Sequence, residues 1–161
     1  MNLEKLFALQ KELDLRIRSE HNLLSNNLIQ RKILALQVEI GELANETRCF
    51  KYWSQKKPSP KHVILEEYVD CLHFILSIGL EKEISNVNVE LKLMDNSLTE
   101  QFLNLYIDLN DFVICQTREQ YITLFEDFIS LGASLGFSES DIENAYLDKN
   151  LVNHERQSCG Y

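Results

Sequence analysis

The chain has 161 residues and a formal net charge of −9 at pH 7, a length that suits one domain with a continuous core. The acidic balance argues against a nucleic-acid-binding protein, which normally carries a basic surface. Hydrophobic residues at 45% and charged residues at 25% are ordinary globular values and argue against disorder. With only 5 Gly and 2 Pro to punctuate turns, helices are favoured over strands.

Apolar residues recur at helical spacing along most of the chain and predict an all-α bundle of about five or six helices, with residues 1–161 forming a single domain. Residues 138–141 have the serine-x-x-acid form of a capping box and open a last helix through Tyr146. Residues 83–96 show no clear period and are expected to form a loop or a short helix. The earlier helices are predicted at residues 2–19, 28–49, 61–81, 97–114 and 117–135.

Two acidic pairs stand out on the second and third predicted helices. They are Glu39 with Glu42, and Glu67 with Asp70. Residues three apart share a helix face, so each pair points two carboxylates the same way. An antiparallel hairpin of these helices would bring the four carboxylates level. Magnesium prefers oxygen ligands, and four carboxylates exceed what one ion needs, so the pattern indicates a site for two or more Mg²⁺ ions.

Two other interpretations of the acids compete with magnesium. A di-iron bundle needs Glu-x-x-His motifs, and none of the 4 histidines follows a glutamate by three residues. His73 follows Asp70 by three, which is a single, imperfect match. Acids three apart are also common on solvated helix faces. Two pairs on adjacent helices favour a metal site, but spacing alone leaves the solvated face open.

Residues 50–58, Phe-Lys-Tyr-Trp-Ser-Gln-Lys-Lys-Pro, form a basic and aromatic connector between the two acidic helices. It is longer than most connections between bundle helices, which indicates a binding loop. Gly41 stands between the first two acids and would let a helix or a ligand approach the backbone closely. Gln10 and Asp14 share a face of the first helix, and that spacing alone also fits a solvated surface.

Four stretches together resemble the dimeric, all-α dUTPases, which are related to the MazG-type nucleoside-triphosphate pyrophosphohydrolases. Leu9-Gln10-Lys11-Glu12-Leu13-Asp14 is similar to the family's uracil-side motif. The family's first metal motif and the loop after it resemble Glu39-x-x-Glu42-x-x-x-Glu46 followed by Phe50-Lys51-Tyr52-Trp53-Ser54. Its second metal motif resembles Glu67-x-x-Asp70-x-x-His73-Phe74. Its C-terminal phosphate-binding motif resembles Tyr146-x-x-Lys149-Asn150-x-x-Asn153-x-x-Arg156-Gln157-x-x-Gly160-Tyr161. Residues 83–137 carry no motif that aligns with the family.

The resemblance implies Mg²⁺-dependent hydrolysis of dUTP, and of dUDP, to dUMP by a homodimer. It assigns catalysis and metal binding to Glu39, Glu42, Glu67 and Asp70. It assigns phosphate binding to Lys51, Lys149, Asn153, Arg156 and Tyr161. It places the base and sugar against Gln10, Asp14, Trp53, His73 and Phe74. Two alternatives are a relative that acts on another nucleoside triphosphate and a catalytically idle interaction protein on the same fold.

The remaining features concern the setting of the protein. The 4 cysteines lack the spacing of a zinc site or a disulfide framework, which indicates a reduced compartment. Residues 1–5 have no apolar signal core, and no apolar run approaches the roughly 20 residues of a membrane span. We therefore expect a cytoplasmic enzyme, in the host cytoplasm if phage-encoded, with no nucleic-acid or membrane partner. A protein regulator of such an enzyme is conceivable from the resemblance.

Overall fold

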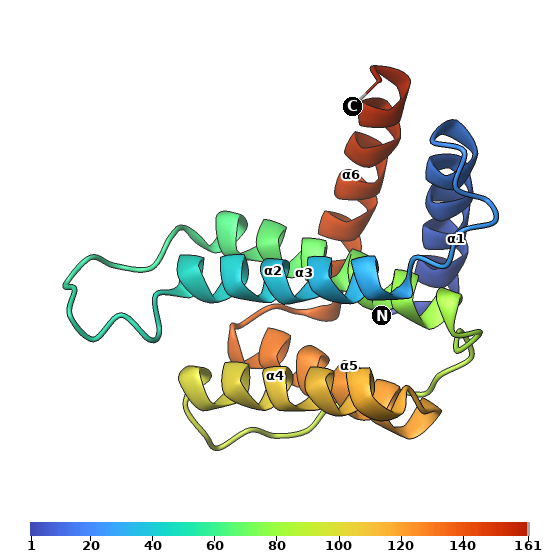
Figure 1. The fold of residues 1–161 in the computed structure, drawn as a ribbon. Coiled ribbons are helices and arrows are strands. Elements are labelled where there is room, and N and C mark those ends of the chain that lie inside the picture. Colours follow the sequence, from blue (N-terminus) through green and yellow to red (C-terminus); the bar gives the residue numbers. More distant parts are fainter. Residues whose placement is uncertain (161) are drawn as a thin grey trace.

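A computed structural model describes residues 1–160, which form six α-helices and no strand (Figure 1). The prediction of an all-α bundle is confirmed. The helices are α1 (Leu3–Glu20), α2 (Ile29–Thr47), α3 (Lys61–Glu81), α4 (Leu98–Cys115), α5 (Arg118–Ser134) and α6 (Glu139–Ser158). None of the helices in this part of the chain combines the length and apolarity that a membrane crossing requires.

Helix α3 is the centre of the bundle. It packs against α1, α2, α5 and α6, and α2 lies antiparallel beside it (Figure 1). The α4–α5 pair covers one side of the α2–α3 pair, while α1 and α6 rise together on the other (Figure 1). The second half of α3 is buried on nearly all sides, from Tyr68 to Gly79. This agrees with its increasingly apolar sequence and leaves Glu66, Glu67 and Asp70 on the first half, with Glu81 at the last residue.

Local sequence explains where the helices begin and end. Ser97 and Ser138 each form a capping box with the acid three residues later, which satisfies backbone N–H groups of the first turn. Helix α2 ends at Arg48, which adopts the left-handed conformation with φ 58°. Pro60 precedes α3, and Gly136 follows α5 with φ 80°, a conformation that glycine adopts without strain.

The last helix is longer than its sequence pattern predicts. Helix α6 continues past Tyr146 to Ser158, because residues 147–158 contain neither Gly nor Pro and its inner face packs against α1 and α3. The extension matters for function, because it places Lys149, Asn153 and Arg156 on one helical face. Residues 83–96 form a loop, as predicted, and the Lys92 backbone N–H of this loop donates to the Ser130 hydroxyl of α5.

Replacing Gly79 by Ala should destabilise the protein, whereas Gly41→Ala should not. A methyl group at Gly79 would lie 2.3 Å from the Tyr121 hydroxyl and 2.9 Å from the backbone oxygen of Ile84. Overpacking of this kind costs about 1–3 kcal/mol. At Gly41 the nearest atom, the Tyr106 hydroxyl, would be 3.4 Å away, so alanine gains helix propensity of about 1 kcal/mol. Urea denaturation of both variants measures the difference, and equal stabilities would contradict this packing.

Candidate active site

Three of the predicted metal ligands meet on the facing sides of α2 and α3. One carboxylate oxygen each from Glu39, Glu67 and Asp70 lies within 4.8 Å of the others. All three side chains are partly buried. Glu42 stands outside this group of three and is exposed, but its charge raises the pKa of both Glu39 and Glu67. The antiparallel pairing of α2 and α3 therefore gathers acids that lie about thirty residues apart in the chain.

The electrostatics of this acidic cluster favour a cation. Burial raises the pKa of Glu39 to about 7, and the charges of Asp70, Glu42 and Glu67 add to the effect. Burial and neighbouring carboxylates likewise raise the pKa of Glu67 and of Asp70. The donor set consists of carboxylate oxygens, the ligands of hard divalent cations such as Mg²⁺. His73 lies outside this group of three, and its Nδ1 lies 2.7 Å from the Gln10 amide oxygen.

Helix α6 brings positive charge to the acidic cluster. The Lys149 ammonium donates to Asp70 at 2.7 Å and to Glu66 at 3.1 Å. The positive charge of Arg156 also lowers the pKa of Asp70. The C-terminal cations that the sequence pointed to as phosphate ligands thus lie beside the carboxylates that it pointed to as metal ligands.

A cavity of about 560 Å³ extends from the acidic cluster between α1, α2, α3 and α6. This volume lies within the 300–1,000 Å³ range of small-molecule sites. The predicted site residues that line it are Gln10, Asp14, Glu39, Asp70, His73, Phe74, Asn153 and Arg156. Those outside its lining are Glu42, Glu67, Lys51, Trp53 and Lys149, while Tyr161 lies outside the described residues.

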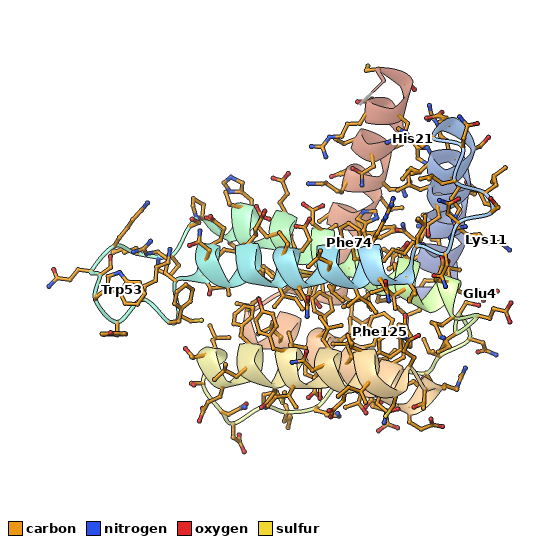
Figure 2. The ribbon with its side chains drawn as sticks, in the orientation of Figure 1. Glu4, Lys11, His21, Trp53, Phe74 and Phe125 are labelled. Atoms are coloured by element: carbon orange, nitrogen blue, oxygen red, sulfur yellow. The ribbon has the colours of Figure 1, made fainter. Side chains whose placement is uncertain are left out.

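The basic and aromatic connector lies at the far end of the α2–α3 pair. Trp53 is 64% exposed, and its ring packs edge-on against Tyr52 and Phe50 (Figure 2). The Lys51 ammonium donates to the Asn45 side chain of α2. Figure 2 shows Trp53 in this loop, beyond the ends of α2 and α3, and Phe74 near α6. Neither Lys51 nor Trp53 lines the cavity, and their assigned roles stay predictions.

The hydrogen bonds around Gln10 and Asp14 in the cavity involve residues that sequence reasoning missed. Lys32 and Ser77 both donate to the Asp14 carboxylate, at 2.9 and 2.5 Å. The Tyr146 hydroxyl donates to Gln10 at 2.8 Å. Lys32 precedes Glu39 by seven residues and Ser77 follows Asp70 by seven, so two helical turns place each on the cavity face. That register was readable from the sequence, whereas the Tyr146 contact depends on how α6 packs against α1.

The raised pKa of Glu39 predicts a pH-dependent cost to folding. The native state binds this proton more tightly than the unfolded chain, whose ordinary value is 4.5. The stabilising contribution is therefore present below about pH 4.5 and lost as pH rises through about 7. In metal-free buffer, Glu39→Gln should increase the free energy of unfolding at pH 8 by about 1 kcal/mol, allowing for solvent screening. At pH 4 it should have no effect.

Urea denaturation at both pH values checks this expectation. Glu12→Gln is the matched control, because Glu12 is exposed on α1 and away from the cluster. Its effect should be the same at pH 4 and pH 8. If Glu39→Gln stabilised the protein equally at the two pH values, charge repulsion within the cluster would not be the cause.

Comparison with known proteins agrees with this arrangement. A family model described as dUTPase matches residues 2–161, nearly the whole chain. No curated protein matches the chain. The match includes α1 with Gln10 and Asp14, the α2–α3 pair with the acidic cluster, and α6 with its cations. The chain therefore belongs to the dUTPase family and is a dUTP-hydrolysing enzyme.

Proposed function

We propose that the enzyme hydrolyses dUTP to dUMP and pyrophosphate with Mg²⁺ held at the acidic cluster. The observation that carries this proposal is the cavity itself. Its lining includes Glu39 and Asp70 of the acidic cluster, Gln10 beside His73 about one helical turn further along α3, and Asp14 beside Ser77 about one turn beyond that. Asp70 and Ser77 are seven residues apart on α3, a rise of about 10 Å. That span accommodates a nucleoside with its phosphates directed towards the cluster.

The acidic cluster would supply the metal chemistry. Glu39, Glu67 and Asp70 would hold Mg²⁺, with Glu42 beside them, and the bound ion would neutralise phosphate charge and lower the pKa of a water molecule. A carboxylate of the cluster accepts the proton of the attacking water.

Side chains of α6 and α3 would hold the rest of the nucleotide. Asn153 and Arg156 line the cavity, and Lys149 lies at its acidic end, so their donors can bind phosphate oxygens. Phe74 lines the cavity on α3 and offers a ring face on which a base can stack. The same site accepts dUDP, because a shorter phosphate chain still reaches the acidic cluster.

A homodimer forms part of the proposal, and exposed apolar side chains support it. Leu34 and Val38 on α2 are 62% and 51% exposed, and Leu103 and Ile107 on α4 are 57% and 56% exposed. Helices α2 and α4 pack against each other, so these side chains can form one surface. Apolar surface of this kind marks an interaction site. Sedimentation equilibrium of the wild-type protein tests the oligomeric state.

A nucleotide panel tests the reaction and its substrate. The purified protein is incubated with Mg²⁺ and dUTP, dUDP, dCTP, dTTP or UTP, and both pyrophosphate and phosphate are measured. The proposal expects pyrophosphate from dUTP, phosphate from dUDP and much slower turnover of the others. A preference for another triphosphate would instead favour a house-cleaning pyrophosphohydrolase on the same fold.

A further inference from the structure

Lys32 is a largely buried cation beside Asp14 in the cavity. Its side chain is 11% exposed, and its ammonium lies 2.9 Å from Asp14 and 3.0 Å from Glu81. Glu81 also accepts from Arg18 at 2.5 Å. The side chains of Arg18, Glu81, Lys32 and Asp14 thus form a chain of alternating positive and negative charges with no net charge. Buried charges persist only when they are paired in this way, so the Asp14 carboxylate is tied to Lys32.

The ion pair fixes which way the Gln10 side chain faces. A carboxylate only accepts hydrogen bonds, so the Gln10 atom that lies 2.8 Å from Asp14 Oδ1 must be the amide nitrogen. The amide oxygen of Gln10 then faces the Tyr146 hydroxyl at 2.8 Å and His73 Nδ1 at 2.7 Å. A reversed amide would place its oxygen against the negative carboxylate. Because Gln10 is only 3% exposed, water cannot compensate for that loss.

The fixed orientation gives the cavity a defined polarity. The Gln10 amide oxygen accepts two hydrogen bonds, from Tyr146 and His73, and one N–H of its amide donates to Asp14, so the second N–H remains for a ligand. Beside it, Asp14 Oδ1 has a further lone pair that can accept a hydrogen bond. A donor therefore stands next to an acceptor, and both residues line the cavity. Uracil presents a carbonyl oxygen beside its N3–H, which complements that pair. Cytosine presents an amino group beside an unprotonated N3, which is the reverse pattern at both atoms.

We propose that Lys32 is a positioning residue for base selection: by pairing with Asp14 it locks the Gln10 amide so that the site accepts a carbonyl beside an N–H. The inference rests on the proposed function only in placing the base at this end of the cavity. Lys32 lines the cavity, but the role assigned to it is to hold Asp14 and not to bind the nucleotide directly. With two carboxylates around it, it has no unbalanced charge to attract phosphate, unlike the neighbouring exposed Arg31.

Calorimetric titration of the full-length protein in EDTA with dUMP, dCMP and dTMP tests this role. Thymine carries the same carbonyl and N–H as uracil and differs only by its 5-methyl group, so dTMP reports on pocket shape alone. Lys32→Met should reduce the preference for dUMP over dCMP at least tenfold and leave the preference for dUMP over dTMP unchanged. Arg31→Met, which removes a charge from the same cavity, should weaken all three ligands equally and change neither ratio.

Three outcomes would overturn the proposal. They are an unchanged dUMP/dCMP ratio in folded Lys32→Met, a parallel fall of both ratios, and a wild-type protein that does not distinguish dUMP from dCMP. Circular dichroism verifies folding, and Lys32→Gln, which keeps a polar group in place, serves if the methionine variant does not fold. Because binding is measured without metal or turnover, a failure of Mg²⁺-dependent hydrolysis would refute the proposed function and leave this result standing.

Discussion

Asp70→Asn is expected to slow dUTP hydrolysis by roughly a thousandfold, the size of effect seen when one preorganised electrostatic group is lost from an active site. Asp70 lies within 4.8 Å of Glu39 and Glu67 and accepts from Lys149 at 2.7 Å, so it stands between the proposed metal ligands and a proposed phosphate-binding cation. Initial rates of pyrophosphate release with saturating Mg²⁺ measure the change.

The same substitution should leave the fold intact. Burial raises the pKa of Asp70, so the native state does not favour its charge, and a neutral amide fits the position. The melting temperature should therefore stay within a few degrees of the wild type. Asp111→Asn provides the control, because Asp111 is exposed on α4 and far from the cavity. A folded Asp70→Asn enzyme with wild-type turnover would show that the acidic cluster does not serve catalysis.

Lys149→Met should raise the affinity of the protein for a divalent cation and lower its affinity for a nucleotide. In the free protein, Lys149 neutralises Asp70 and Glu66, so a divalent cation must compete with its ammonium for the Asp70 carboxylate. Removing that charge should tighten Mn²⁺ binding without nucleotide by about tenfold, the effect of one partly shielded ion pair. It should weaken the binding of a non-hydrolysable dUTP analogue, because the proposed phosphate-binding ammonium is lost.

Electron paramagnetic resonance of free Mn²⁺ and calorimetry with the analogue measure the two effects. A purely structural role for Lys149 would weaken both, since the acidic cluster would lose its arrangement. Lys61→Met is the control, because Lys61 also pairs with an acid, Asp141, but lies at the start of α3 away from the cavity. It should change neither binding constant. Parallel losses in Lys149→Met would reject competition between Lys149 and the metal.

The acidic cluster could be predicted because it depends on two local rules. Helical spacing places Glu39 with Glu42 and Glu67 with Asp70, and a connector of moderate length makes the two helices antiparallel. The structure adds a distinction that spacing cannot make, because Glu42 is exposed and lies outside the closest group. Whether Glu42 joins the group depends on the direction in which its side chain leaves the helix, and that direction is set by the rotation of α2 about its axis relative to α3.

The base end of the cavity was only partly predictable. Gln10 and Asp14 share a helix face, but the sequence gives no sign that Lys32 ties Asp14 down or that Tyr146 orients Gln10. Those contacts join residues 18 and 136 positions apart and exist only after α1, α2 and α6 have packed together. The composition of residues 50–58 favoured a binding loop, and these residues do form an exposed loop in which the aromatic rings of residues 50–53 pack on one another; its binding role stays a prediction.

We propose that the acidic cluster binds a divalent cation and positions it beside a nucleotide in the adjoining cavity. Pyrophosphate release from dUTP by the purified full-length protein at pH 8, in excess Mg²⁺ and again in EDTA, tests it most directly. The geometry predicts rapid release with Mg²⁺, none in EDTA, and recovery when Mg²⁺ is restored. Turnover that persists unchanged in EDTA would show that hydrolysis does not need a divalent cation at the acidic cluster.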